Sequence, residues 1–208
     1  MNRLINQTRV ILIGGSSHTG KSTLAGALAT KLGWSYRSTD KLARHPGRPW
    51  VGTNGKAIPE HVAEYYREMS VDALFLDVLS HYKNNVLPII EVIVHSYTSD
   101  LSTECLVLEG SALLPEFVAN LVRENNVKAI WLTARDELFQ HRIKSESNFC
   151  HLCQDKKHLI QKFLNRTLLY NKYIKEEVDR LGFMFIDIES VATMEKLLNK
   201  CMELMAVS

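Results

Sequence analysis

Cysteines and long apolar runs are scarce in this chain. Its 208 residues contain four cysteines, too few and too widely spaced for the disulfide framework of a small secreted protein. No segment approaches the roughly 18 consecutive apolar residues of a membrane-spanning helix, and residues 1–8 lack the apolar core of a signal peptide. We therefore expect reduced cysteines, a cytoplasmic location and no membrane partner.

An excess of charge of one sign is also missing. The 25 basic and 23 acidic side chains are interspersed, and the formal net charge is +2 at pH 7. Domains that bind nucleic acid usually gather basic residues on one face, so we expect no nucleic-acid partner and only a local positive field at a site. Hydrophobic residues make up 46% of the chain, which suits the core of one α/β domain over residues 1–208. The oligomeric state cannot be determined from the sequence.

The most specific motif is a glycine-rich loop between a strand-like run and a helical run. The segment VILIGGSSHTGKST contains the spacing Gly-x-x-x-x-Gly-Lys-Ser. Glycines let the backbone turn so that successive N–H groups point at phosphate oxygens, and the following helix adds its positive N-terminal end. A strand before the loop and a helix after it distinguish a P-loop from a chance match. The predicted nucleotide-binding residues are Gly15, Ser16, Ser17, His18, Thr19, Gly20, Lys21, Ser22 and Thr23.

Two side chains of this loop have specific roles in a P-loop. Lys21 is expected to reach the β- and γ-phosphates of ATP, and Ser22 to place its hydroxyl on Mg²⁺. The motif does not distinguish ATP from GTP. It therefore predicts a nucleotide and Mg²⁺ as the cofactors.

Strand-like runs alternate with helical patterns along the chain, which is typical of βαβ units on a parallel sheet. The five strand-like runs are residues 8–13, 34–38, 105–108, 127–132 and 183–188. Such sheets bind ligands at the carboxyl ends of their strands. Asp40 and Glu109 follow the second and third runs, so they are candidate site residues; helix caps or surface charges are the alternative reading.

Residues 41–59 combine loop composition with positive charge. They contain three prolines, three glycines, Arg44, Arg48 and Lys56. Arginines close after a candidate catalytic aspartate suit the capture of a carboxylate or phosphate, and a plain basic surface loop is the alternative. Helical patterns follow, and we expect residues 41–98 to cover the acceptor side of a cleft. Residues 144–157 are polar and poorly periodic, which is more typical of a lid than of a core element.

These features together resemble the P-loop small-molecule and nucleotide kinases, a group that includes adenylate, shikimate, gluconate and 2-phosphoglycerate kinases and chloramphenicol phosphotransferase. The phrases STDKLAR, LVLEGSALL and WLTARDELFQHRI are looser echoes of that group's acceptor-side, third-strand and lid segments. The resemblance covers nearly the whole chain. It implies an α/β three-layer fold with a five-stranded parallel sheet in the order 2-3-1-4-5, helices on both faces and a mobile lid at about residues 142–160.

The resemblance also implies roles for single residues. Asp40 would meet the acceptor hydroxyl as general base, and Arg142 would neutralise the transferring phosphoryl group. Ser22 would bind Mg²⁺ directly, with Asp40 and Glu109 acting through water. The predicted catalytic residues are Lys21, Asp40 and Arg142. The predicted acceptor-binding residues are Asp40, Arg44, Arg48, Glu109 and Gly110.

The chain departs from this group after Arg142. A second lid arginine is expected there, but Lys144 and Glu146 occupy the segment. Arg166 is a candidate substitute if its helix packs over the nucleotide, and a solvent-facing helical arginine otherwise. The lid region also holds Cys150-x-x-Cys153 near several histidines, which is half of the zinc site of some adenylate kinases. The other residues of that cluster are His141, His151 and His158. A second cysteine pair is absent from the sequence, so we favour packing or exposed side chains over zinc.

We therefore expect an ATP-dependent kinase that transfers the γ-phosphoryl group of MgATP to a small, anionic metabolite. A nucleoside monophosphate kinase is the alternative within the same class. A regulatory P-loop ATPase or nucleotide switch is the alternative from a different class. The sequence does not identify the acceptor, because specificity depends on the shape of the pocket.

Overall fold

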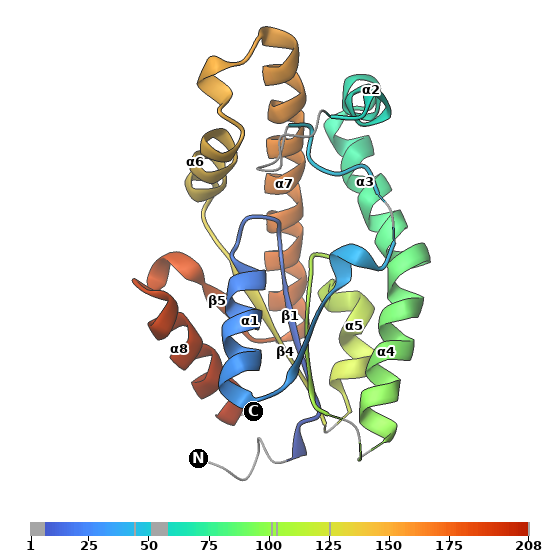
Figure 1. Ribbon diagram of the computed structural model, residues 1–208, viewed down its shortest axis with the longest axis vertical. Coiled ribbons are helices and arrows are strands. Elements are labelled where there is room, and N and C mark those ends of the chain that lie inside the picture. Colours follow the sequence, from blue (N-terminus) through green and yellow to red (C-terminus); the bar gives the residue numbers. More distant parts are fainter. Residues whose placement is uncertain are drawn as a thin grey trace.

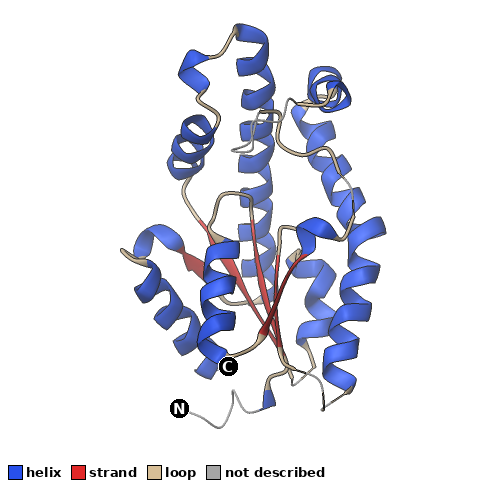
Figure 2. Ribbon diagram, viewed as in Figure 1, coloured by secondary structure: helices blue, strands red, loops and turns tan. Residues whose placement is uncertain are grey.

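A computed structural model describes residues 7–43, 45–50, 58–100, 102, 104–124 and 126–207. One five-stranded sheet organises them, with the strand order β2-β3-β1-β4-β5 and parallel pairing throughout. The strands are β1 Val10–Gly15, β2 Ser35–Ser38, β3 Leu106–Glu109, β4 Val127–Thr133 and β5 Phe185–Asp187. Figure 2 shows the strands in red with helices on both sides. The predicted fold class and strand order are confirmed.

Helices form the outer layers. Their bounds are α1 Lys21–Leu32, α2 Glu60–Glu68, α3 Val71–His81, α4 Leu87–Ser99, α5 Pro115–Val122, α6 Asp136–Glu146, α7 Gln154–Leu181 and α8 Met194–Val207. Within the described ranges, none of them is both long and apolar enough to cross a membrane.

The core lies on both faces of the sheet, because side chains along a strand alternate between the faces. Ile11 and Ile13 of β1 pack with α1 and α8 on one face. Leu12 packs with α3, α4 and α5 on the other face. α7 contributes to both clusters, through Phe163 to the first and Ile174 to the second. In Figure 1 the upper half of α7 extends beyond the sheet, with α6 on one side and α2 on the other.

Most helix ends follow the local signals in the sequence. Gly182 ends α7 in the left-handed region at φ 68°, and Ser70 Oγ accepts a hydrogen bond from Ala73 N at the start of α3. Ser190 precedes the last helical run in the sequence, where a serine is a candidate cap, but this prediction is wrong. Ser190 belongs to a 3₁₀ turn before α8, and Thr193 Oγ instead accepts the hydrogen bond from the first turn of that helix.

Pro88 lies in the first turn of α4, after Leu87, and does not interrupt the helical path. A π-helical turn over Tyr82–Val86 joins α3 to α4 immediately before it. A proline within an α-helix removes an N–H donor and its ring clashes with a carbonyl one turn earlier. The wider π turn relieves that clash. From the sequence, Pro88 could either break the preceding helical pattern or open a further helix, and the second is observed.

The lid segment, predicted at about residues 142–160, is more ordered than its composition suggests. α6 continues to Glu146, a 3₁₀ turn covers Phe149–His151, and α7 begins at Gln154. Phe149 and Leu152 pack against the core. These two apolar residues provide a packing contact that the weak periodicity of residues 144–157 does not reveal. Movement of the segment as a lid stays a prediction.

Candidate active site

The P-loop joins β1 to α1 with the backbone that the motif predicts. Gly15 and Gly20 have φ values of 136° and 88°, and a Cβ on Gly15 would lie 2.5 Å from Leu132 O. His18 also has a positive φ of 67°. Ser16 Oγ donates to Thr167 O of α7 at 3.3 Å, which fixes the loop against that helix. The loop is therefore tightly turned and anchored, as phosphate binding by backbone N–H groups requires.

Lys21 is buried in this loop. Its side chain donates from Nζ to Ser16 O at 2.7 Å, and the residue is 7% exposed. Burial lowers the pKa of Lys21 to about 8, while the nearby carboxylates of Glu109 and Asp40 oppose that shift. A buried ammonium group gains strongly from an added anion, because water screens the interaction weakly there. This arrangement favours a phosphate ligand.

A cavity of about 470 Å³ opens in front of the P-loop. Its walls come from the P-loop, the tips of β2 and β3, and one face of α6. Arg142 of α6 donates from Nη1 to His18 O at 2.5 Å, so the structure brings this predicted catalytic residue to the P-loop. The lining residues are Ser17, His18, Gly20, Lys21, Ser22, Thr23, Asp40, Arg48, Glu109, Ser111, His141, Arg142, Ser145 and Glu146. Gly15, Ser16 and Thr19 shape the loop behind this wall.

A second, larger cavity of about 1110 Å³ lies on the acceptor side. It shares Ser17, Asp40, Arg48 and Ser111 with the first cavity. Asp40 sits in a 3₁₀ turn, Thr39–Lys41, directly after β2. Asp40 and Arg48 therefore lie where the two cavities meet. A group passing from a nucleotide to an acceptor would cross this junction.

Glu109 ends β3 inside the nucleotide-side cavity and is 1% exposed. Tyr36 OH donates to Glu109 Oε1 at 3.1 Å, and the hydroxyl of Ser22 lies beside the same tyrosine. Partial burial and the Glu109 carboxylate raise the pKa of Tyr36. Sequence reasoning missed Tyr36, because an aromatic residue in a strand carries no motif. Its hydroxyl contacts both Ser22 and Glu109, two of the predicted metal-binding residues.

Gly110 packs closely against Thr39, the residue before Asp40. Its φ is 156°, and a Cβ at this position would lie 1.7 Å from Thr39 Oγ1. A side chain here would displace the 3₁₀ turn that holds Asp40. Gly110 is not one of the residues lining either cavity, so its predicted contact with an acceptor stays a prediction. Arg44, the other predicted acceptor-binding arginine of this loop, lies outside the described residues.

Arg166 points into the acceptor-side cavity from α7. Its guanidinium lies 4.7 Å from the ring centroid of Phe163 and 5.5 Å from that of Tyr66. Nη1 is buried, and within the described part of the chain it has no hydrogen-bond partner. A cation with a buried unpaired donor is a strong candidate for binding an anionic ligand. Arg166 lines the larger cavity and is not one of the residues lining the nucleotide-side cavity.

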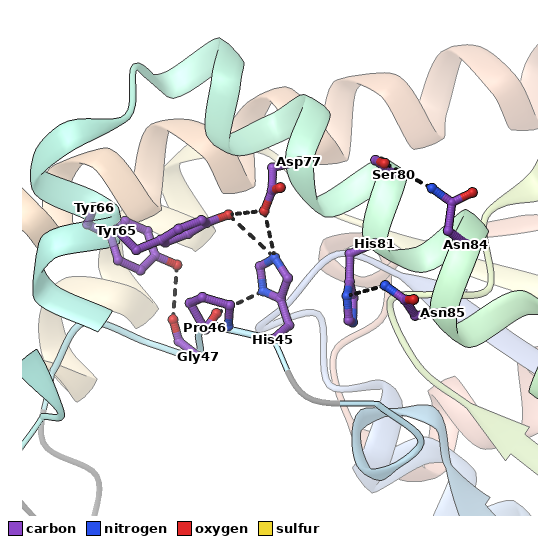
Figure 3. A network of polar contacts seen from close by, with 10 residues as sticks. All are labelled: His45, Pro46, Gly47, Tyr65, Tyr66, Asp77, Ser80, His81, Asn84 and Asn85. Carbon is purple, nitrogen blue, oxygen red and sulfur yellow. Dashed lines mark hydrogen bonds and ion pairs between the residues drawn. The ribbon is translucent and has the colours of Figure 1, made fainter. Parts of the chain in front are cut away.

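A polar network fixes the loop that contains His45 and Arg48 to α2 and α3 (Figure 3). We call this loop, described over residues 45–50, the acceptor-side loop. Asp77 Oδ2 accepts a hydrogen bond from Tyr65 OH at 2.7 Å and lies 3.2 Å from His45 Nε2. His45 Nδ1 donates to Pro46 O at 2.9 Å. A carbonyl only accepts, so Nδ1 carries a proton, and Nε2 also lies 3.4 Å from Tyr65 OH. Burial lowers the pKa of His45, and the charges of Arg166 and His81 act in the same direction; the bonds to Pro46 and Asp77 oppose this shift without reversing it.

We expect Asp77→Ala to lower the free energy of unfolding by about 1–2 kcal/mol, because Tyr65 and His45 lose their shared acceptor. Urea denaturation followed by circular dichroism measures this change. Glu91→Ala removes an exposed acid from α4 and should change stability by less than about 0.5 kcal/mol. Equal effects of the two substitutions would show that the network contributes nothing to holding the loop.

The cysteines of the lid segment are exposed free thiols. Cys150 lies in the 3₁₀ turn after α6, and Cys153 precedes the first residue of α7. Among the residues that the structure describes, no group of three or more His, Cys, Asp or Glu side chains is placed to hold a metal ion. His141 lines the nucleotide-side cavity. Elemental analysis of tag-free protein is the direct test for zinc.

The five-stranded parallel sheet and the geometry of the loop are those of a P-loop protein, and the resemblance to the P-loop small-molecule kinases is confirmed. No protein-family model matches the chain. A curated shikimate kinase from Nitratidesulfovibrio vulgaris (strain Hildenborough) is 38% identical over 66 residues, which cover 32% of this chain. That match spans 35% of the shikimate kinase, about a third of its length.

Two crystal structures show the same fold over almost the whole chain. A gluconokinase from Sinorhizobium meliloti 1021 superposes with a TM-score of 0.54 at 16% identity, covering 95% of this chain and 91% of the gluconokinase. A shikimate kinase from Bacteroides thetaiotaomicron superposes with a TM-score of 0.50 at 14% identity, covering 95% of this chain and 98% of the kinase. At these identities the likeness concerns the fold, and the reaction must be argued from the site.

Proposed function

We propose that this protein is an ATP-dependent kinase that transfers the γ-phosphoryl group of MgATP to a hydroxyl group of a small anionic metabolite. The observation that carries this proposal is the meeting of two cavities at Asp40 and Arg48. One cavity is built on a P-loop, and the other is lined by Arg166 with its unpaired buried donor. A kinase-like fold supports the same reaction class.

The residues around the P-loop fit a magnesium nucleotide. Ser22, Asp40 and Glu109 line one cavity, and a hydroxyl with two carboxylates matches the oxygen ligands that Mg²⁺ prefers. Protein sites usually hold Mg²⁺ through one or two carboxylates, while phosphates and water complete its shell. When bound, Mg²⁺ neutralises phosphate charge. Lys21 adds a second positive charge at the β- and γ-phosphates.

Transfer at the junction needs few protein groups. Asp40 takes the proton of the acceptor hydroxyl. The oxygen of that hydroxyl forms a bond to the γ-phosphorus, and the bond between the γ-phosphorus and the ADP oxygen breaks. Arg142, held at the P-loop by His18 O, neutralises charge on the transferring group. Arg166 binds the anionic group of the acceptor, which fixes the position of the hydroxyl.

A nucleoside monophosphate is the second candidate acceptor. The volume of about 1110 Å³ on the acceptor side favours it, because this exceeds what a three- or six-carbon metabolite fills. Its phosphate would bind the same arginine. A regulatory ATPase has no use for such a cavity beside the P-loop, so we place the nucleotide switch third.

Acceptor-stimulated turnover tests the proposal. ADP formation from MgATP should rise about tenfold or more when hydroxy acids and sugar phosphates are supplied, because water is a poorly positioned acceptor. Nucleoside monophosphates supplied separately distinguish the second candidate. A rate that stays at the level of hydrolysis with every acceptor class would support the nucleotide switch.

A further inference from the structure

Glu146 is an unusual residue for a phosphate-binding cavity. It ends α6 in the segment where a second lid arginine is expected, and it lines the cavity beside Arg142. A carboxylate near bound phosphates is repulsive unless a cation neutralises it. Arg48 provides that cation, because its Nη1 donates to Glu146 Oε1. The acid at position 146 therefore brings an arginine from the acceptor-side loop to the place where the lid lacks one.

Arg48 lies close to the P-loop as well as to the acceptor. It lines both cavities, and its positive charge contributes to lowering the pKa of Lys21 and of His18, after burial in both cases. Its side chain is 49% exposed, and its guanidinium lies 5.8 Å from the ring centroid of Trp50. These relations place the guanidinium at the junction and within electrostatic reach of a bound γ-phosphate.

The second oxygen of Glu146 ties this pair to the P-loop. His18 Nε2 lies 3.0 Å from Glu146 Oε2, and His18 Nδ1 lies 2.9 Å from Ser17 Oγ. Burial, followed by the charge of Arg48, lowers the pKa of His18 to about 4, so the ring is neutral at pH 7. Because a carboxylate only accepts, the single ring proton is on Nε2, and Nδ1 accepts from Ser17. Glu146 thus joins three elements: the P-loop, α6 and the acceptor-side loop.

We propose that Arg48 takes the place of the missing second lid arginine and contacts the γ-phosphoryl group of the bound nucleotide, with Glu146 as its positioning residue. This inference rests on the proposed function, since it requires a nucleotide on the P-loop. Among the described residues, Glu146 is the hydrogen-bond partner of Arg48, through Nη1. The guanidinium carries five N–H donors, so others remain for phosphoryl oxygens.

This assignment differs from the expectation that Arg48 binds the distal anion of the acceptor. Arg166 is better placed for that anion, because it lines the acceptor-side cavity and carries the unpaired buried donor. The two roles give different results with nucleotides alone. An arginine on the γ-phosphoryl group discriminates ATP from ADP, whereas an arginine on the acceptor affects neither.

Calorimetric binding of the non-hydrolysable analogue Mg·AMP-PNP and of MgADP tests the inference without an acceptor. Arg48→Met should weaken Mg·AMP-PNP binding about tenfold or more, because a charge-assisted contact with the γ-phosphate is lost. MgADP binding should change less than about twofold. Arg67→Met removes an equal charge from α2, outside both cavities, and is the matched control. Melting temperatures confirm that each variant is folded.

A charge exchange then tests the position of the arginine. Arg48→Glu should lose the preference for Mg·AMP-PNP, and adding Glu146→Arg should restore it to within about threefold, because α6 then provides the cation. Failure to restore it, or equal losses for both nucleotides in Arg48→Met, would overturn the inference. So would unchanged binding of both nucleotides. If the parent protein bound neither nucleotide, the proposed function itself would fail.

Discussion

Replacing Lys21 by alanine should reduce MgATP affinity by about 10²–10³-fold, because the loop loses the buried ammonium group that we expect to contact the β- and γ-phosphates. The sequence suggests an accessible loop lysine, but the structure buries it at 7% exposure beside Asp40 and Glu109. The substitution leaves the buried Glu109 carboxylate and Ser16 O without this cation, so the free energy of unfolding should fall by about 1–3 kcal/mol while the protein stays folded. Fluorescent-nucleotide titration and urea denaturation measure the two effects.

Lys31→Ala is the control for this substitution. Lys31 lies in the last turn of the same helix, is exposed and donates to Asn199 Oδ1. It should leave nucleotide affinity unchanged. Parent-like affinity in Lys21→Ala would remove the P-loop assignment, and with it the basis of the proposed function.

Asp40→Asn should lower turnover by about 10²–10⁴-fold with the true acceptor, because the amide keeps the size of the side chain but does not accept a proton. MgATP affinity should change far less, since Asp40 lies at the junction and the P-loop holds the phosphates. Steady-state kinetics with separate nucleotide titration distinguishes the two quantities. Asp179→Asn, an exposed substitution on α7, should be neutral. Unchanged turnover in Asp40→Asn would exclude this residue as the general base.

The strands, several helix ends and the P-loop can be predicted from the sequence, because each produces a local pattern. Buried parallel strands appear as short apolar runs, and glycines end α1 and α7, where the backbone turns left-handed at Gly33 and Gly182. The P-loop is local, so its glycines, Lys21 and Ser22 can be assigned from spacing alone. The strand order came from the resemblance to P-loop kinases, because periodicity does not determine which strands are neighbours.

The junction could not be predicted in the same way, because its contacts join distant parts of the chain. Arg48 and Glu146 are 98 positions apart, and His18 and Glu146 are 128 positions apart. No local pattern indicates such pairs. The direction of Arg166 depends on how α7 packs over the sheet. Helical spacing alone leaves both a site role and a surface role open for this residue.

The central claim is that the γ-phosphoryl group of ATP crosses the junction to a small anionic acceptor. The most direct measurement follows ATP labelled in the γ-phosphoryl group, incubated with Mg²⁺, parent protein or Lys21→Ala, and pools of hydroxy acids, sugar phosphates and nucleoside monophosphates. We expect label in one phosphorylated acceptor with the parent protein and none with the variant. Label released only as inorganic phosphate with every pool would contradict the account.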